Sequence, residues 1–123
     1  MNPNRQQAEE RRSERGAGTV LAAGLGMVVV VAMSVLLLLA QSAVMASRAA
    51  AAADLAALAA ADALRGVTTG EPCTVAAAVA TQHGASLVSC AAGGDQSVEV
   101  RTQLTASTIL GAATGRARAG PPP

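Results

Sequence analysis

The sequence predicts an α+β protein: a long N-terminal transmembrane helix continues outward beyond the bilayer and leads into a small helix–strand–strand outer domain. Three observations support this prediction. No charged residue lies between Arg15 and Arg48, no proline lies between Asn4 and Glu71, and apolar and polar residues alternate over residues 97–104. We expect five segments: a cytoplasmic segment 1–15, a transmembrane helix 16–40, an alanine-rich helical extension 41–66, an αββ domain 67–104 and a flexible tail 105–123.

The first element is the membrane helix. Its most apolar part, residues 20–39, contains only Val, Leu, Ala, Gly, Met and one Ser. That length matches the ~20 apolar residues that a helix needs to cross the hydrocarbon core of a bilayer. We therefore predict a single-pass protein of the plasma membrane.

Arginine placement predicts the orientation of this helix. Arg5, Arg11, Arg12 and Arg15 precede the apolar run, whereas only Arg48 lies close to its far end. Cytoplasmic flanks of membrane helices carry the excess of Lys and Arg. The N-terminus is thus predicted to be cytoplasmic and the C-terminal domain extracytoplasmic.

A cleaved signal peptide is the alternative interpretation of the apolar run. Residues 44–46 (Val-Met-Ala) offer small residues at which signal peptidase can cut, after Ala46. The apolar core of a signal peptide is usually 7–15 residues long, however, and this run is longer. We therefore expect the helix to be retained as an anchor.

Beyond the membrane, residues 47–65 consist almost entirely of strong helix formers and end at Gly66. We predict one continuous helix from Val20 to Arg65, roughly 70 Å long at 1.5 Å per residue. Asp62 and Arg65 are spaced to form an ion pair on its surface. The alanine-rich circumference allows other helices to approach closely.

Small residues also line one row inside the membrane. Gly18, Ala22 and Gly26 are spaced four residues apart, the pattern that permits tight contact between membrane helices. Glycine and alanine are common in membrane helices in any case. Together with the alanine-rich extension, the row favours bundling with other long helices.

The outer domain is predicted from changes in local pattern. Pro72 suits the first turn of a helix over residues 73–84. Residues 86–91 read as a short strand, residues 93–95 as a hairpin turn, and residues 97–104 as a half-buried strand. The inward face of the second strand is expected to consist of Val98, Val100, Thr102 and Leu104.

Cys73 and Cys90 are the only cysteines, and we predict that they form a disulfide. The helix from Cys73 to Gly84 rises roughly 16 Å, and the strand back to Cys90 spans roughly 20 Å less the turn. Cys90 should therefore lie opposite Cys73. The alternatives are two free buried cysteines, or a metal site that includes His83, whose spacing matches no zinc pattern.

The composition excludes several functional classes. The net charge of +1 excludes a strongly basic nucleic-acid binder, and the absence of Phe, Tyr and Trp removes any platform for base stacking. No phosphate-binding loop, metal-ligand cluster or nucleophile elbow occurs. We predict no enzymatic activity, no cofactor and no small-molecule substrate. The C-terminal residues 111–123 lack periodicity and end in three prolines, so we expect a mobile tail.

The pattern resembles a known family. Residues 15–18 (Arg-Gly-Ala-Gly) directly before the apolar helix, continued by the alanine-rich residues 48–64, are similar to the TadE-like proteins, pilin-related minor components of tight-adherence (Flp-type) pilus and secretion systems. Residues 70–73, 84–90 and 116–121 resemble the short actinobacterial branch encoded near a helicase and Tad secretion genes. The resemblance extends from about Glu14 to Pro121.

The resemblance implies a function. It suggests a membrane-anchored pseudopilin or minor pilin whose partners are the bilayer and other Tad or pilin-like helices, and it marks Gly16 as a processing position. Pilin-like proteins that are cleaved there usually carry a Glu about five residues after the glycine, where this chain has Leu21. Membrane residence as an assembly or tip subunit is therefore expected more directly than incorporation into a filament. The alternatives are a secreted effector or binding protein released near Ala46, and an accessory subunit of another membrane complex.

Overall fold

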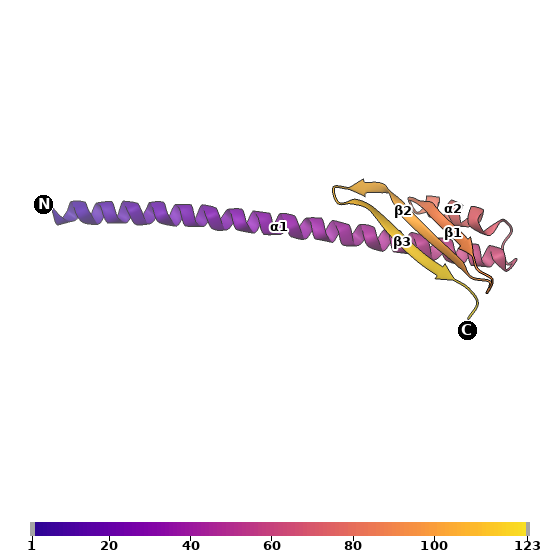
Figure 1. Ribbon diagram of the computed structural model, residues 1–123. Helices are drawn as coiled ribbons and strands as arrows, with labels where there is room; N and C mark the ends of the chain where they lie inside the picture. The colour runs from indigo at the N-terminus through magenta and orange to yellow at the C-terminus, as the bar shows by residue number, and fades with distance from the viewer. Residues whose placement is uncertain (1, 123) are drawn as a thin grey trace. The chain divides into compact units, whose positions relative to one another are not determined.

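The computed structural model describes residues 2–122 and confirms the α+β fold (Figure 1). Two helices precede three strands in the sequence, and the strands form one antiparallel sheet in the order β1-β2-β3. The elements are α1 (Pro3–Leu64), α2 (Pro72–Gln82), β1 (Ala85–Ala92), β2 (Val98–Thr108) and β3 (Gly111–Ala119).

The expected mobile tail is wrong for most of its length. Gly111–Ala119 forms β3, which pairs with β2 from Val98↔Ala119 to Thr108↔Gly111, with an irregularity between Gln103 and Ser107. Residues Gly115 to Ala119 in fact alternate small and charged side chains, which is the period of a half-buried strand. Because the inward residues are Gly and Ala rather than β-branched or aromatic, the pattern did not resemble a typical strand.

Helix α1 begins earlier than expected. It starts at Pro3, so the segment before Arg15 is helical as well. The segment contains Gln, Ala, Glu and Arg, all good helix formers, and proline is well tolerated in a first turn. The Asn2 side chain accepts a hydrogen bond from the backbone N–H of Asn4 (3.3 Å) and so caps the free N–H groups.

The C-terminal end of α1 lies where the sequence predicted it. Gly66 has a positive φ of 75°. The N–H of Gly66 bonds to the carbonyl of Ala63 (3.1 Å), and that of Val67 bonds to the carbonyl of Asp62 (2.9 Å). These two bonds form a Schellman motif, which requires a left-handed residue at the glycine position. Arg65 and Asp62 form the predicted ion pair at 2.9 Å.

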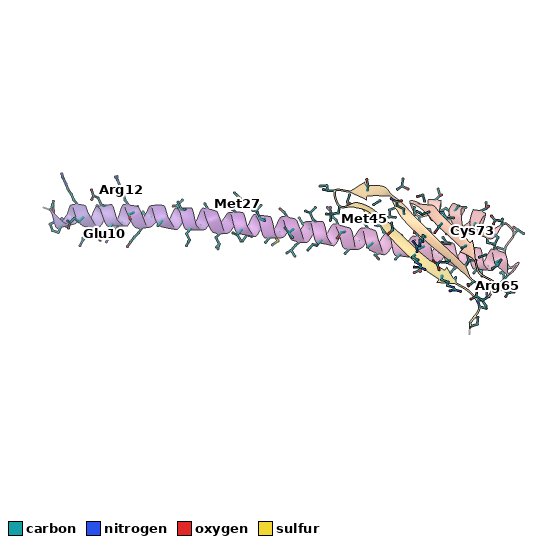
Figure 2. All side chains as sticks on the ribbon, in the orientation of Figure 1. Glu10, Arg12, Met27, Met45, Arg65 and Cys73 are labelled. Carbon is teal, nitrogen blue, oxygen red and sulfur yellow. A yellow bond between two sulfur atoms is a disulfide. The ribbon has the colours of Figure 1, made fainter. Side chains whose placement is uncertain are left out.

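The chain divides into two units, with the division between Leu39 and Ala40. In the first unit, residues 3–39 form a single helix whose side chains, such as Met27, project outward (Figure 2). The second unit contains the rest of α1, helix α2 and the sheet. Apolar residues of the first unit are exposed, whereas many of those in the second unit are buried in a core.

In the second unit, alanines of α1 pack against the sheet. The buried alanines follow helical spacing and form one face; they are Ala49, Ala52, Ala53, Ala56, Ala57, Ala60, Ala61 and Ala63. From the sheet, Val98, Val100, Thr102 and Leu104 of β2 are buried, as predicted. The chain's own sheet and helix α2 thus share a core with the alanine face that we had expected to meet other helices.

The helix approaches the sheet closely at one strand pair. Thr102 of β2 pairs with Gly115 of β3, and the Thr102 hydroxyl donates to the carbonyl of Ala49 (3.1 Å). A Cβ atom on Gly115 would overlap the same Ala49 carbonyl and lie 3.0 Å from the N atom of Ala50. Gly115 is therefore required by contact with backbone atoms, since only glycine leaves room for the helix.

Candidate membrane segment and interaction surfaces

Helix α1 is long and apolar enough to span a membrane, and no residue of its most apolar window is buried within the chain. Fourteen large apolar side chains lie between Val20 and Leu39, and each is at least 44% exposed. Fully burying a side chain of this kind is worth roughly 1.5–3 kcal/mol, so covering these fourteen completely in lipid is worth on the order of 20–40 kcal/mol. The described residues of the chain leave these side chains exposed to solvent, and a lipid environment would cover them.

The small-residue row of this helix is open. Apart from the adjacent residues and the surrounding helix backbone, no heavy atom of the described residues lies within 4 Å of a Cβ built on Gly18 or Gly26. A different face of the same helix has a shallow indentation of about 670 Å³. It is lined by Gly16, Ala17, Val20, Leu21, Gly24, Leu25 and Val28. Two faces of one helix therefore offer close approach to a neighbour, and the sequence pointed only to the row at Gly18, Ala22 and Gly26.

The two candidate processing positions both lie within α1. Gly16 is exposed and helical, at the beginning of the charge-free run. Ala46 is also exposed and helical, but it lies three residues before Ala49, which is fully buried in the domain core. A cut after Ala46 would leave the core helix with almost no chain before its first buried residue.

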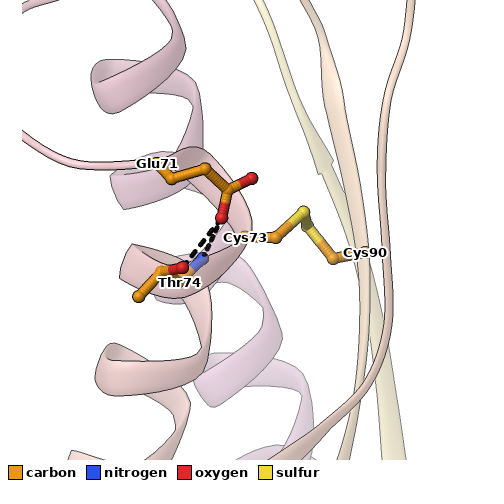
Figure 3. The surroundings of a disulfide bond; sticks show 4 residues. All are labelled: Glu71, Cys73, Thr74 and Cys90. Carbon is orange, nitrogen blue, oxygen red and sulfur yellow. Dashed lines mark hydrogen bonds between the residues drawn. A yellow bond between two sulfur atoms is a disulfide. The ribbon is translucent and has the colours of Figure 1, made fainter.

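The predicted disulfide joins Cys73, near the start of α2, to Cys90 of β1 (Figure 3). Their Cα atoms are 5.8 Å apart. Helix α2 thereby becomes covalently attached to the sheet, which it also contacts through the buried Ala76 and Ala80. Both sulfur atoms take part in this bond, so neither cysteine is free.

Glu71 caps the N-terminus of α2 beside the disulfide (Figure 3). Its carboxylate accepts hydrogen bonds from the hydroxyl (2.8 Å) and the backbone N–H (3.0 Å) of Thr74. These bonds, the hydroxyl first, favour the charged form and lower the pKa of Glu71 below its ordinary value of 4.5. The cap fixes the turn that presents Cys73 to the sheet.

A polar network joins the β1–β2 turn to β3. Ser97 donates from its hydroxyl to Asp95 (2.6 Å) and accepts from Nε of Arg118 (3.0 Å), while Arg118 pairs with Asp95 at 2.8 Å. The Ser97 hydroxyl is the main cause of the lowered pKa of Asp95, and the Arg118 charge adds to it. The turn predicted at residues 93–95 is thus held by the C-terminal strand.

The outward face of the sheet carries the charged side chains of its strands, Glu99, Arg101, Arg116 and Arg118. Arg101 and Arg116 lie directly opposite each other on β2 and β3, and Glu99 pairs with Arg116 at 2.7 Å. A hollow of about 400 Å³ lies beside them, lined by Val88, Arg101, Thr102, Thr114, Gly115 and Arg116. The face is polar and open, in contrast to the alanine- and valine-filled side.

Sequence reasoning missed three features of this surface. The capping role of Glu71 could have been predicted from its position. It directly precedes Pro72, which begins the helix, and lies three residues before Thr74, from whose N–H it accepts a hydrogen bond. Arg116 and Arg118 had a signal in their two-residue spacing, which places both side chains on one face of a strand, where they pair with Glu99 and Asp95. Gly115 had no signal of its own, because its role depends on a helix residue 66 positions earlier in the chain.

No protein-family model, no curated protein and no solved structure matches this chain.

Proposed function

We propose that the chain is a non-enzymatic, TadE-like pseudopilin or minor pilin, anchored in the plasma membrane and acting in tight-adherence-type pilus assembly or secretion. The observation that carries the proposal is the continuity of α1. One helix contains a lipid-length apolar run, uncovered by the chain, and then forms the core of a small αβββ domain. The sequence motifs at residues 15–18 and 48–64 add the family resemblance to this architecture.

In this proposal the two ends of the chain have different surroundings. The four arginines before the apolar run keep the N-terminal segment in the cytoplasm. The domain lies outside, where a disulfide such as Cys73–Cys90 persists. The domain then displays its sheet, while the membrane helix meets the helices of other Tad components.

The helix faces left open suggest how those components bind. Small residues allow backbones to approach, and van der Waals packing then drives association within lipid. Gly18, Ala22 and Gly26 form the proposed contact row, and Gly24 lies in the separate indentation. Because the alanines beyond Ala49 are used within the domain, helix contacts are expected in the membrane part.

The test is affinity purification of the tagged full-length chain in mild detergent from cells that contain a Tad system. We expect Tad platform or pilin-like components to co-purify, and Gly26→Leu to reduce their yield. Ala23→Leu is the matched control, since it enlarges a side chain that belongs neither to the contact row nor to the indentation around Gly24. Insertion of the chain without capture of any Tad component would contradict the proposal.

The mass of the mature chain separates this proposal from a secreted protein. A full-length chain, or one that has lost the residues through Gly16, fits an anchored pseudopilin. A chain that begins after Ala46 would instead fit release by signal peptidase. The measurement needs only intact-protein mass spectrometry of the membrane and medium fractions.

A further inference from the structure

The turn between β2 and β3 exposes two large apolar residues. Ile109 is 94% exposed and Leu110 is 69% exposed. Gly, Asn, Asp and Ser usually occupy such turns, because the turn faces water and its backbone needs them. Exposing an Ile-Leu pair to water at the end of a hairpin is therefore unfavourable. This indicates that an apolar environment covers the two side chains.

The hairpin around this turn is free of charge. From Thr102 to Gly115, fourteen residues contain no Asp, Glu, Lys or Arg. The charged side chains of β2 and β3 all lie in the other half of the hairpin; they are Glu99, Arg101, Arg116 and Arg118. The sheet thus has a charged end and an uncharged end, and the apolar turn is at the uncharged one.

The uncharged end points back along α1 toward the start of the second unit. Figure 1 shows the β2–β3 turn at the end of the sheet that lies toward the beginning of this part of the helix. The hydrogen bond from Thr102 to Ala49 fixes the point at which strand and helix meet. The turn and Ala40 belong to the same compact unit, so the position of the turn relative to this part of the helix is defined.

The lengths agree with this placement. Ala49 lies ten residues after Leu39, the last residue of the apolar run, which is about 15 Å along the helix. Seven residues of strand lead from Thr102 to Ile109, about 23 Å when fully extended. The extended strand is longer than this stretch of helix, and the turn lies toward the first residues of the second unit, which directly follow the apolar run in the sequence.

We propose that the β2–β3 turn is a second membrane contact, in which Ile109 and Leu110 insert into the outer interface of the same bilayer that α1 spans. The occupant of the apolar turn is lipid, and the serine and threonine side chains around it lie at headgroup level. Two contacts, one helix and one hairpin, restrict the tilt of the domain on the membrane. The inference rests on the membrane anchoring proposed above.

The chain lacks aromatic residues, so a single introduced Trp is the only strong fluorophore. We would reconstitute the full-length Leu110→Trp variant into phosphatidylcholine vesicles and compare its emission with and without brominated acyl chains. Val88→Trp is the matched control, because Val88 is a 58% exposed apolar residue on β1. Val30→Trp, in the middle of the apolar run, reports on the span itself. Formation of the Cys73–Cys90 disulfide in each variant reports that the domain has folded.

We expect brominated lipid to reduce the emission of Leu110→Trp and Val30→Trp and to leave Val88→Trp unchanged. Loss of emission for Val30→Trp alone would overturn the turn contact and leave the anchor standing. A blue-shifted but unquenched Leu110→Trp would mean that protein covers the turn, which also overturns the proposal. Quenching of Val88→Trp would place the whole sheet on the membrane, and no quenching of Val30→Trp would refute the anchor as well.

Discussion

Replacing Gly115 by Ala tests the contact between helix and sheet. The new Cβ would overlap the carbonyl of Ala49, and because both sides are backbone, neither rotates away. Overfilling of this kind costs about 1–3 kcal/mol. Separation of the two elements would also break the bond from Thr102 to Ala49, worth about 0.5–1.5 kcal/mol. We expect Gly115→Ala to destabilise the domain by about 2–4 kcal/mol, a large share of the stability of so small a domain.

Trypsin digestion in increasing urea measures this effect on the full-length chain in lipid nanodiscs. Arg101, Arg116 and Arg118 lie in strands, so cleavage at these residues reports unfolding of the sheet. Gly94→Ala is the control, because a Cβ there meets nothing within 4 Å and should change stability little.

The direction of the change decides the outcome. Without the helix contact, alanine would be more stable than glycine within a strand by roughly 0.5–1 kcal/mol. A Gly115→Ala variant that is as stable as the parent, or more stable, would therefore refute the packing of α1 on the sheet at this residue.

Three further changes test the domain. Thr102→Val removes the hydrogen bond to α1 and should cost about 1 kcal/mol in urea unfolding; no change would mean that the bond does not form in solution. Replacing Cys73 and Cys90 by Ser removes a link across 17 residues and should cost about 3 kcal/mol, and a urea midpoint equal to that of the parent in non-reducing buffer would contradict a stabilising disulfide. Because hydrogen bonds lower the pKa of Glu71 and of Asp95 in the folded chain, their stabilisation is complete above the ordinary values of 4.5 and 3.8. This stabilisation is lost as the pH falls through the pKa values of the folded chain, so the urea midpoint should decrease below about pH 4. A midpoint that rises on acidification would disprove this linkage.

Local patterns predicted most of the fold. The charge-free run, the stop at Gly66 and the alternation of Val98, Val100, Thr102 and Leu104 each depend on neighbours in the sequence, and the structure confirms the helix, its end and the buried strand face. The pairing of Cys73 with Cys90 also followed from short-range geometry, because one helix and one strand determine it.

Contacts between distant residues were not predictable in the same way. Strand β3 is made of Gly, Ala, Thr and Arg, and its stability comes from pairing with β2 and from ion pairs to Glu99 and Asp95. The alanine face of α1 was equally suited to a partner helix and to the chain's own sheet, since small side chains permit both. Only the three-dimensional placement of Gly115 against Ala49 distinguishes the two.

Topology is the central claim, and the two cysteines report it directly. Intact cells would be treated with a membrane-impermeant maleimide, with and without an impermeant reductant. We expect Cys73 and Cys90 to be labelled only after reduction, because the proposed topology places the disulfide-bonded domain outside the cell membrane. Labelling that occurs only after the cells are lysed would place the domain in the cytoplasm and contradict both the orientation and the proposed pilin-like function.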